Sequence, residues 1–222
     1  FNTAVDTNAI SNFGVISAEN GIGILSYSDD TFIYNSADAE IVSNADSNSG
    51  SAAIYVAGIQ ARIVNEGAVS AASARGIFSV ATAYLSVDNT GTIGANNEAI
   101  ASTSDTVLIK NSGMLSSTSS ATIDSTGVND NFRLINSGTI SNASTVSAAI
   151  NVSASDTEVQ ITNKGFITSG NGSAIDATTT LSGGIFLRNF GAISGDVTLE
   201  AISVTIRSQT GEIDGAIRLE GN

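Results

Sequence analysis

The chain contains no proline, cysteine, histidine or tryptophan, and only 13% of its residues are charged. Without cysteine there is no disulfide framework, no thiolate zinc site and no nucleophilic thiol. Without histidine there is no imidazole base, so the Ser-His and Cys-His mechanisms are excluded. These absences remove most familiar enzyme mechanisms, and we expect a non-enzymatic protein.

Positive charge is also scarce, because 21 acidic residues stand against 8 basic ones and the net charge is −13. This balance repels phosphate backbones and anionic membrane surfaces. No apolar run approaches the roughly 18 residues of a spanning helix, and no N-terminal segment resembles a signal peptide. We therefore expect neither nucleic-acid binding nor membrane insertion of this segment. Because the chain begins at Phe1, we expect a processed product or a fragment of a longer protein.

The sequence does contain an internal repeat, of which "INSGTIS" at residues 135–141 is one copy. An asparagine recurs at intervals of 20 to 30 residues, and a ninth copy, "SQTGEI", carries Gln209 instead. The asparagines are Asn12, Asn35, Asn65, Asn89, Asn111, Asn136, Asn163 and Asn189. Glycine follows two positions later in every unit except the second, where Ala37 stands. The glycines are Gly14, Gly67, Gly91, Gly113, Gly138, Gly165, Gly191 and Gly211.

Aliphatic residues recur in three columns, of which one precedes each asparagine and two follow each glycine. Within the unit around Asn136 these are Leu134, Ile140 and Ile150. Such a period, with strand-like alternation and no helical spacing, indicates a β-solenoid. We predict a single all-β domain over residues 1–222, a parallel β-helix of about nine coils with three short strands per coil. From residue 189 the second and third columns come closer together, so the rod should change cross-section there.

The asparagine and glycine of the repeat have a structural interpretation. Glycine adopts positive φ without a Cβ penalty, and asparagine forms Asx turns readily. Because coils repeat in register, asparagines at one corner can stack into an amide ladder along the rod. We therefore interpret the Asn and Gly positions as a structural turn ladder and not as a ligand site.

Four acidic residues also recur in register, each opening the strand before an asparagine turn: Asp30, Asp105, Asp130 and Asp156. Repetition at one corner favours turn-forming and solubilising residues, with calcium ligation as the alternative. No nonrepeating cluster of acids and bases on one face is evident. We therefore predict no catalytic residue and no cofactor, calcium being the one cofactor left open.

The segments "INSGTISN", "DNTGTIGA", "TNKGFITS" and "RNFGAISG" resemble the repeats of bacterial autotransporter passengers and related large secreted adhesins. The resemblance covers nearly the whole chain. It implies a right-handed β-helix, export to the surface of a Gram-negative bacterium, and an adhesive, matrix-forming or occasionally enzymatic role. The C-terminal membrane barrel and signal peptide usual in that family have no counterpart in this sequence.

We therefore expect an extracellular structural or adhesive rod, such as a surface stalk, biofilm-matrix fibre or filament subunit, with cell-surface glycans or matrix as partners. The alternative is a carbohydrate-active β-helix, a polysaccharide lyase or hydrolase. Neither end shows a capping device, so we also expect head-to-tail self-association, with the coil at Phe1 meeting the coil that ends near Leu219. The alternative is that neighbouring coils of a longer protein supply the caps.

Overall fold

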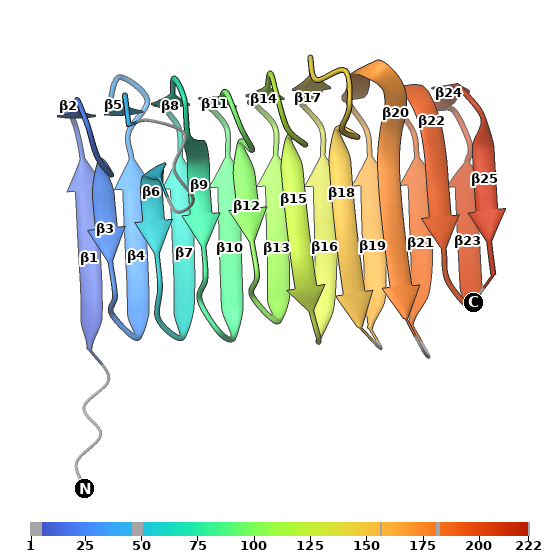
Figure 1. Ribbon diagram of the computed structural model, residues 1–222, viewed down its shortest axis with the longest axis horizontal. Helices are drawn as coiled ribbons and strands as arrows, with labels where there is room; N and C mark the ends of the chain where they lie inside the picture. The colour runs from blue at the N-terminus through green and yellow to red at the C-terminus, as the bar shows by residue number, and fades with distance from the viewer. Residues whose placement is uncertain (1–5, 46–50, 156, 181–182, 222) are drawn as a thin grey trace, which may run out of the picture.

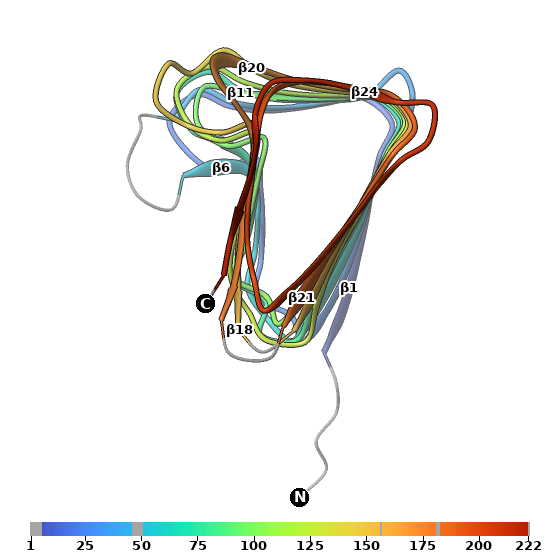
Figure 2. The same cartoon turned by 90° about the vertical axis from the view of Figure 1, so that its right-hand side faces the viewer.

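The computed structural model describes residues 6–45, 51–155, 157–180 and 183–221. These residues form an all-β parallel solenoid without a helix, in which the chain winds as a rod of stacked strands (Figure 1). They accordingly include no helix long and apolar enough to cross a membrane. Viewed along its axis, the rod has a roughly triangular outline with three faces (Figure 2). The predicted all-β parallel solenoid is therefore confirmed.

The first face is a nine-stranded sheet, hereafter the first sheet, whose strands pair in chain order. Its strands are β1 (Thr7–Asn12), β4 (Asp30–Asn35), β7 (Gln60–Asn65), β10 (Tyr84–Asn89), β13 (Thr106–Asn111), β16 (Asn131–Asn136), β19 (Glu158–Asn163), β21 (Gly184–Asn189) and β23 (Ser203–Ser208).

The second and third faces carry the remaining strands. The second face contains β2 (Val15–Ala18), β5 (Glu40–Ser43), β8 (Ala68–Ala71), β11 (Thr92–Ala95), β14 (Met114–Ser117), β17 (Thr139–Asn142) and β24 (Glu212–Asp214). The third face contains β3 (Ile24–Ser26), β6 (Ala52–Val56), β9 (Arg75–Ser79), β12 (Ile100–Ser102), β15 (Ile123–Val128), β18 (Ile150–Ser155) and β25 (Ile217–Glu220). Two long strands, β20 (Phe166–Thr180) and β22 (Ala192–Glu200), run through both faces.

The aliphatic columns form the core because neighbouring coils pair in register. Ile140 pairs with Leu115 and Ile167 on the second face, and Ile150 pairs with Ile123 and Ile175 on the third. All six side chains are buried. Burial of each such side chain is worth about 1.5 to 3 kcal/mol relative to exposure. Each coil therefore depends on its neighbours for a closed core.

Three strands do not recur in every coil. The strands β1–β18 form six sets of three and β23–β25 a seventh, so about seven turns have three separate strands. In β20 and β22 the turn between the second and third faces is absent, and one strand continues across it. Figure 2 shows the last turns cutting the corner at which earlier turns bulge outward, where the sequence predicted a change of cross-section.

Candidate functional site

The eight repeat asparagines lie at one corner of the rod, where each strand of the first sheet from β1 to β21 ends. Their side chains point inward and are at most 6% exposed. From Asn12 to Asn163, each Nδ2 donates to the Oδ1 of the next asparagine along the chain at 2.7–2.9 Å. Seven such bonds therefore form one continuous amide ladder from Asn12 to Asn189.

The ladder also satisfies the turn backbone. The Nδ2 of Asn136 donates to Asn163 Oδ1 at 2.8 Å, to the Phe166 carbonyl at 3.2 Å and to the Gly138 carbonyl at 3.3 Å. Its Oδ1 accepts from Asn111 Nδ2 at 2.8 Å. Because buried amide groups are costly when unpaired, this network stabilises the corner and holds adjacent coils in register.

The repeat glycines serve a purpose different from the one expected. Among the described residues, only Gly127, Gly172 and Gly195 are glycines with positive φ, so the left-handed conformation expected at Gly138 is wrong. A Cβ added at Gly138 would lie within 3.0 Å of the carbonyl oxygen of Gly113. That oxygen accepts a 2.9 Å hydrogen bond from the backbone N–H of Thr139, the first residue of β17. Glycine fits at this position because the corner at Gly113 approaches too closely for a side chain.

Two further assignments within the repeat need correction. In the second unit the glycine position is held by Ala39 and not Ala37, since its carbonyl accepts from Ala68 just as Gly67 accepts from Thr92. In the ninth unit Ser208, not Gln209, pairs with Asn189. Both units contain inserted residues between the asparagine-equivalent position and the next strand, and these insertions interrupt the regular spacing of the repeat.

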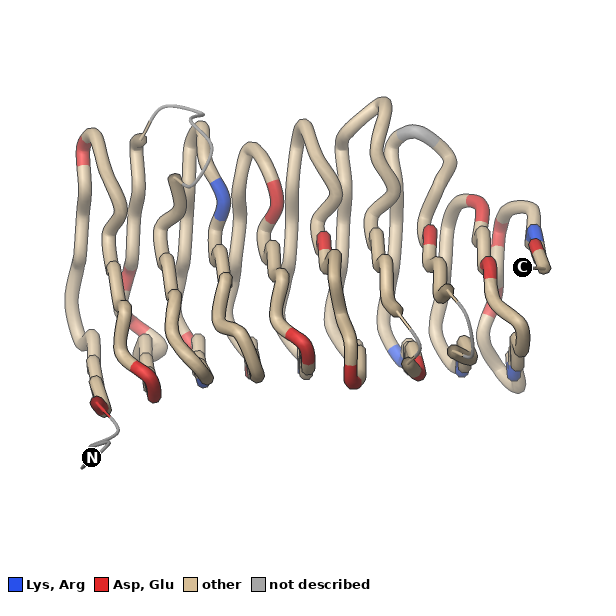
Figure 3. Tube along the Cα trace, turned by 60° about the horizontal axis from the view of Figure 1, so that its bottom comes forward, with Lys and Arg blue, Asp and Glu red and all other residues tan. Residues whose placement is uncertain are grey.

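The described members of the acidic row lie at the start of first-sheet strands or directly before them. Asp30 begins β4, while Asp105 and Asp130 directly precede β13 and β16; Asp156 lies outside the described residues. Asp105 accepts a 2.6 Å bond from the Asn129 side chain. Within the described ranges no group of three or more acidic side chains is arranged to hold a metal ion. Figure 3 shows the acidic positions spread along the rod, several of them at the turns before the first-sheet strands.

The third face carries a cleft that the sequence reasoning missed. Its volume is about 280 Å³, and its lining includes Glu98, Asp124, Asn151 and Asp176. Asp124, Asn151 and Asp176 occupy the same register position on β15, β18 and β20. Each directly follows a buried isoleucine of the third column, and this outward position in three successive coils was the available signal.

The carboxyls of the cleft have different environments. Glu98 forms a 2.7 Å ion pair with Arg75, whose guanidinium also lies 4.4 Å from the centre of the Phe78 ring. Burial raises the pKa of Asp124, and the charge of Glu98 adds to this, whereas the bond from Asn151 and the charge of Arg75 oppose it. Burial also raises the pKa of Asp176, with a smaller contribution from Glu220.

This arrangement places an ion-paired carboxylate beside a carboxyl that resists ionisation. Pairs of this kind serve as general acid and base in glycoside hydrolysis. Arg75, Glu98 and Asp124 thus lie together although they belong to different coils. The cleft is also an ordinary binding surface for hydroxylated ligands, because carboxylate and amide groups accept and donate hydrogen bonds.

Comparisons of the chain with protein-family models, with curated proteins and with solved structures found no match.

Proposed function

We propose that this chain is a non-enzymatic structural and adhesive rod of a bacterial cell surface or extracellular matrix. The observation that carries the proposal is the amide ladder, which continues without interruption through seven coil-to-coil bonds. A buried, fully paired ladder alongside a continuous aliphatic core resists bending and register slip. Such stiffness suits a stalk or fibre, whose purpose is to hold its surface at a distance.

The finer architecture belongs to the same proposal. We infer nine coils of right-handed sense, two of which carry the second and third faces on a single strand. The nine strands of the first sheet support the number. The winding in Figure 2 supports the sense, since the chain passes counterclockwise from first to second to third face while advancing from β1 towards β25. Placement outside the cell rests on the resemblance of the repeats to autotransporter passengers and secreted adhesins.

Self-association through the rod ends is also proposed. Within the described residues the outermost strands β1 and β23 pair on one side only, and Leu25 and Leu219, on the end strands β3 and β25, are 47% and 60% exposed. The Oδ1 of Asn12 receives no asparagine donor among the described residues, so a further coil could extend the ladder there. Because the two ends differ, head-to-tail contact is heterologous and leads to a fibre.

The adhesive role is tested with coated beads. Beads carrying the chain should cluster with one another or attach to surfaces coated with bacterial polysaccharide, whereas albumin-coated beads should not. Beads that stay dispersed and unattached would contradict the role. Sedimentation at increasing concentration tests the end contacts separately, because a strictly monomeric profile excludes head-to-tail stacking.

A second candidate is carbohydrate hydrolysis at the third-face cleft, favoured by the pairing of Glu98 with Asp124. Incubation with neutral and acidic polysaccharides, followed by detection of reducing ends, separates the two candidates. Release that is lost in Glu98→Gln and in Asp124→Asn would establish the enzyme and overturn the non-enzymatic proposal. No release from any substrate is the outcome that the structural proposal expects.

A further inference from the structure

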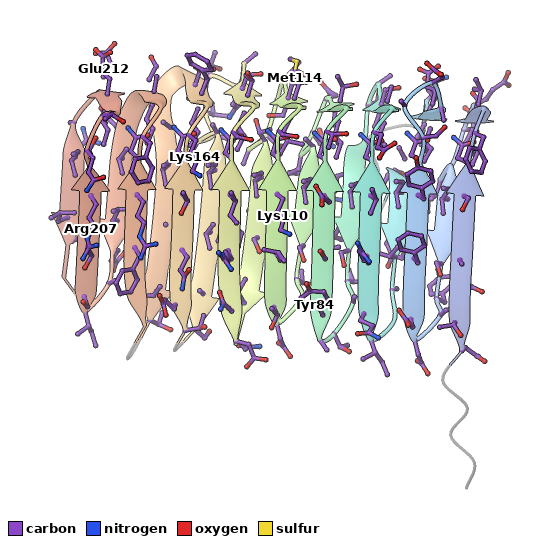
Figure 4. All side chains as sticks on the ribbon, turned by 180° about the vertical axis from the view of Figure 1, so that it is seen from behind. Tyr84, Lys110, Met114, Lys164, Arg207 and Glu212 are labelled. Atoms are coloured by element: carbon purple, nitrogen blue, oxygen red, sulfur yellow. The ribbon has the colours of Figure 1, made fainter. Side chains whose placement is uncertain are left out.

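The outer face of the first sheet carries a row of cations on an otherwise acidic molecule. Five consecutive coils each place one basic side chain on this face or at its corner, hereafter the cationic row. Its members are Lys110 on β13, Arg133 on β16, Lys164 after β19, Arg188 on β21 and Arg207 on β23. Figure 4, which looks onto this face, shows Lys110, Lys164 and Arg207 along the same half of the rod.

The cations of the row are exposed and unpaired. All five residues are exposed, and the two ion pairs found among the described residues, Arg75 with Glu98 and Arg218 with Asp196, include none of them. Arg188 and Arg207 even lie in direct register on neighbouring strands, where like charges repel. Five of the 8 basic residues thus gather here, and none of the five forms an ion pair within the described residues.

Two acidic residues lie on the same face as the row. Asp88 pairs in register with Lys110, at the end towards β10, without forming an ion pair within the described residues. Glu158 lies at the start of β19, at the opposite end of the strand from Lys164, and accepts a 2.7 Å bond from Gln160. Charges on the other faces are screened beyond a Debye length of about 8 Å at physiological salt. A ligand on this face therefore meets positive charge despite the net charge of −13.

We propose that the cationic row binds a linear anionic polysaccharide of the polyuronate type, lying along the solenoid axis. The charges recur once per coil, which is about 4.8 Å, and a sugar in an extended chain advances by a similar distance. Between the cations the same face presents polar groups for sugar hydroxyls, including Gln160, Thr162 and Thr205. The half-buried ring of Phe186 lies two residues from Arg188 on the same face and offers a surface for a sugar ring.

These features favour a polysaccharide over a nucleic acid. Proteins that bind single-stranded nucleic acid stack successive bases on several aromatic rings. Along the outer positions of β13, β16, β19, β21 and β23, Phe186 is the one aromatic residue. Duplex phosphates recur at about 3.4 Å per strand, which does not match the repeat of one cation per coil. The proposal names a ligand class for the adhesive role. Its biological use rests on that role, but the binding of polyuronate to the cationic row does not.

The test uses polygalacturonate as the probe and its fully methyl-esterified form as the uncharged control. Binding is measured by calorimetry at several salt concentrations. We expect polygalacturonate to bind with a log–log salt slope of about −3.5, by analogy with single-strand polyanions contacting five cations, and the methyl ester not to bind. The double variant Arg188→Gln/Arg207→Gln should lower affinity about tenfold or more at low salt and make the slope shallower by about 1.4.

Arg62→Gln and Arg62→Gln/Arg218→Gln are the matched controls, because Arg62 lies on the same sheet at β7, separated from the row by β10, and Arg218 lies on β25. The second control removes the same charge as the double variant and should keep affinity within about twofold. Circular dichroism verifies that each variant is folded.

Absence of binding, equal loss in the matched double control, or equal binding of the methyl ester would overturn the proposal. Tighter binding of a single-stranded DNA oligonucleotide would overturn the assignment to polysaccharide. Coated beads that cluster although polygalacturonate fails to bind would preserve the adhesive role and refute only the cationic row.

Discussion

Glycine in the repeat is explained by close stacking of corners, and a pair of alanine substitutions tests this directly. Gly14 and Gly138 occupy the same turn position, and neither has positive φ. A Cβ at Gly14 would meet no heavy atom within 4 Å, because no described coil precedes it. A Cβ at Gly138 would instead collide with the carbonyl oxygen of Gly113 and the backbone of Ser112. The two sites therefore differ in the neighbour that the new methyl group would meet.

The expected magnitudes have opposite signs. Overpacking a rigid backbone contact costs about 1 to 3 kcal/mol, and displacing Gly113 also weakens the bond that its carbonyl accepts from Thr139, worth about 1 kcal/mol. We expect Gly138→Ala to lose about 2 to 4 kcal/mol of unfolding free energy. Gly14→Ala should gain about 0.4 to 1 kcal/mol, because alanine restricts the unfolded chain.

Urea-induced unfolding, followed by far-ultraviolet circular dichroism, measures both variants against the unmodified chain. Equal destabilisation at the two positions would refute the stacking explanation, since it would show that the turn conformation itself requires glycine. A neutral Gly138→Ala variant would refute it as well, because the corners would then have room for a side chain.

Three further predictions concern the ladder, the cleft and the core. Asn136→Ala should destabilise the protein by about 2 to 5 kcal/mol, because it leaves Asn111 Nδ2 and Asn163 Oδ1 without their ladder partner in a buried corner. Asn12→Ala, at the end of the ladder, should cost less. Equal urea midpoints for the two variants would contradict this. Asp124→Asn should stabilise the protein near pH 7 but not near pH 3. Burial raises the folded-state pKa of Asp124 above its unfolded value, so the unmodified protein loses stability as the pH rises through the raised pKa. A difference in melting temperature between the two proteins that does not vary with pH would refute the reasoning. Ile140→Ala should cost about 2 to 5 kcal/mol in the same urea assay, because its fully buried side chain contributes to the continuous core, and a loss below about 1 kcal/mol would place it outside that core.

The architecture was predictable because register in a solenoid repeats one solution many times. Ile140, Leu115 and Ile167 are buried for the same reason in successive coils, so periodicity alone identifies them as core. The prediction failed where spacing within a coil varies. Ala39 and Ser208 take their places through insertions of one or two residues, and β20 and β22 continue across a corner that other coils turn.

The surface was less predictable, because its function depends on which coils lie side by side and not on the repeat itself. Asp124, Asn151 and Asp176 are 25 to 27 residues apart in sequence, yet share one register position. Lys110 and Arg207 belong to one face although 97 positions separate them. The reason for glycine was also hidden, since positive φ and close approach favour the same residue and only the neighbouring carbonyl distinguishes them.

Exchange of asparagine side-chain amide protons tests the continuous ladder most directly. In a chain labelled with ¹⁵N at asparagine, the Nδ2 protons of Asn35, Asn65, Asn89, Asn111, Asn136 and Asn163 are expected to exchange with solvent far more slowly than those of the exposed Asn20. Their protection should also be lost together on unfolding, because each amide bonds to the next. Exchange at these six positions as fast as at Asn20 would contradict the account.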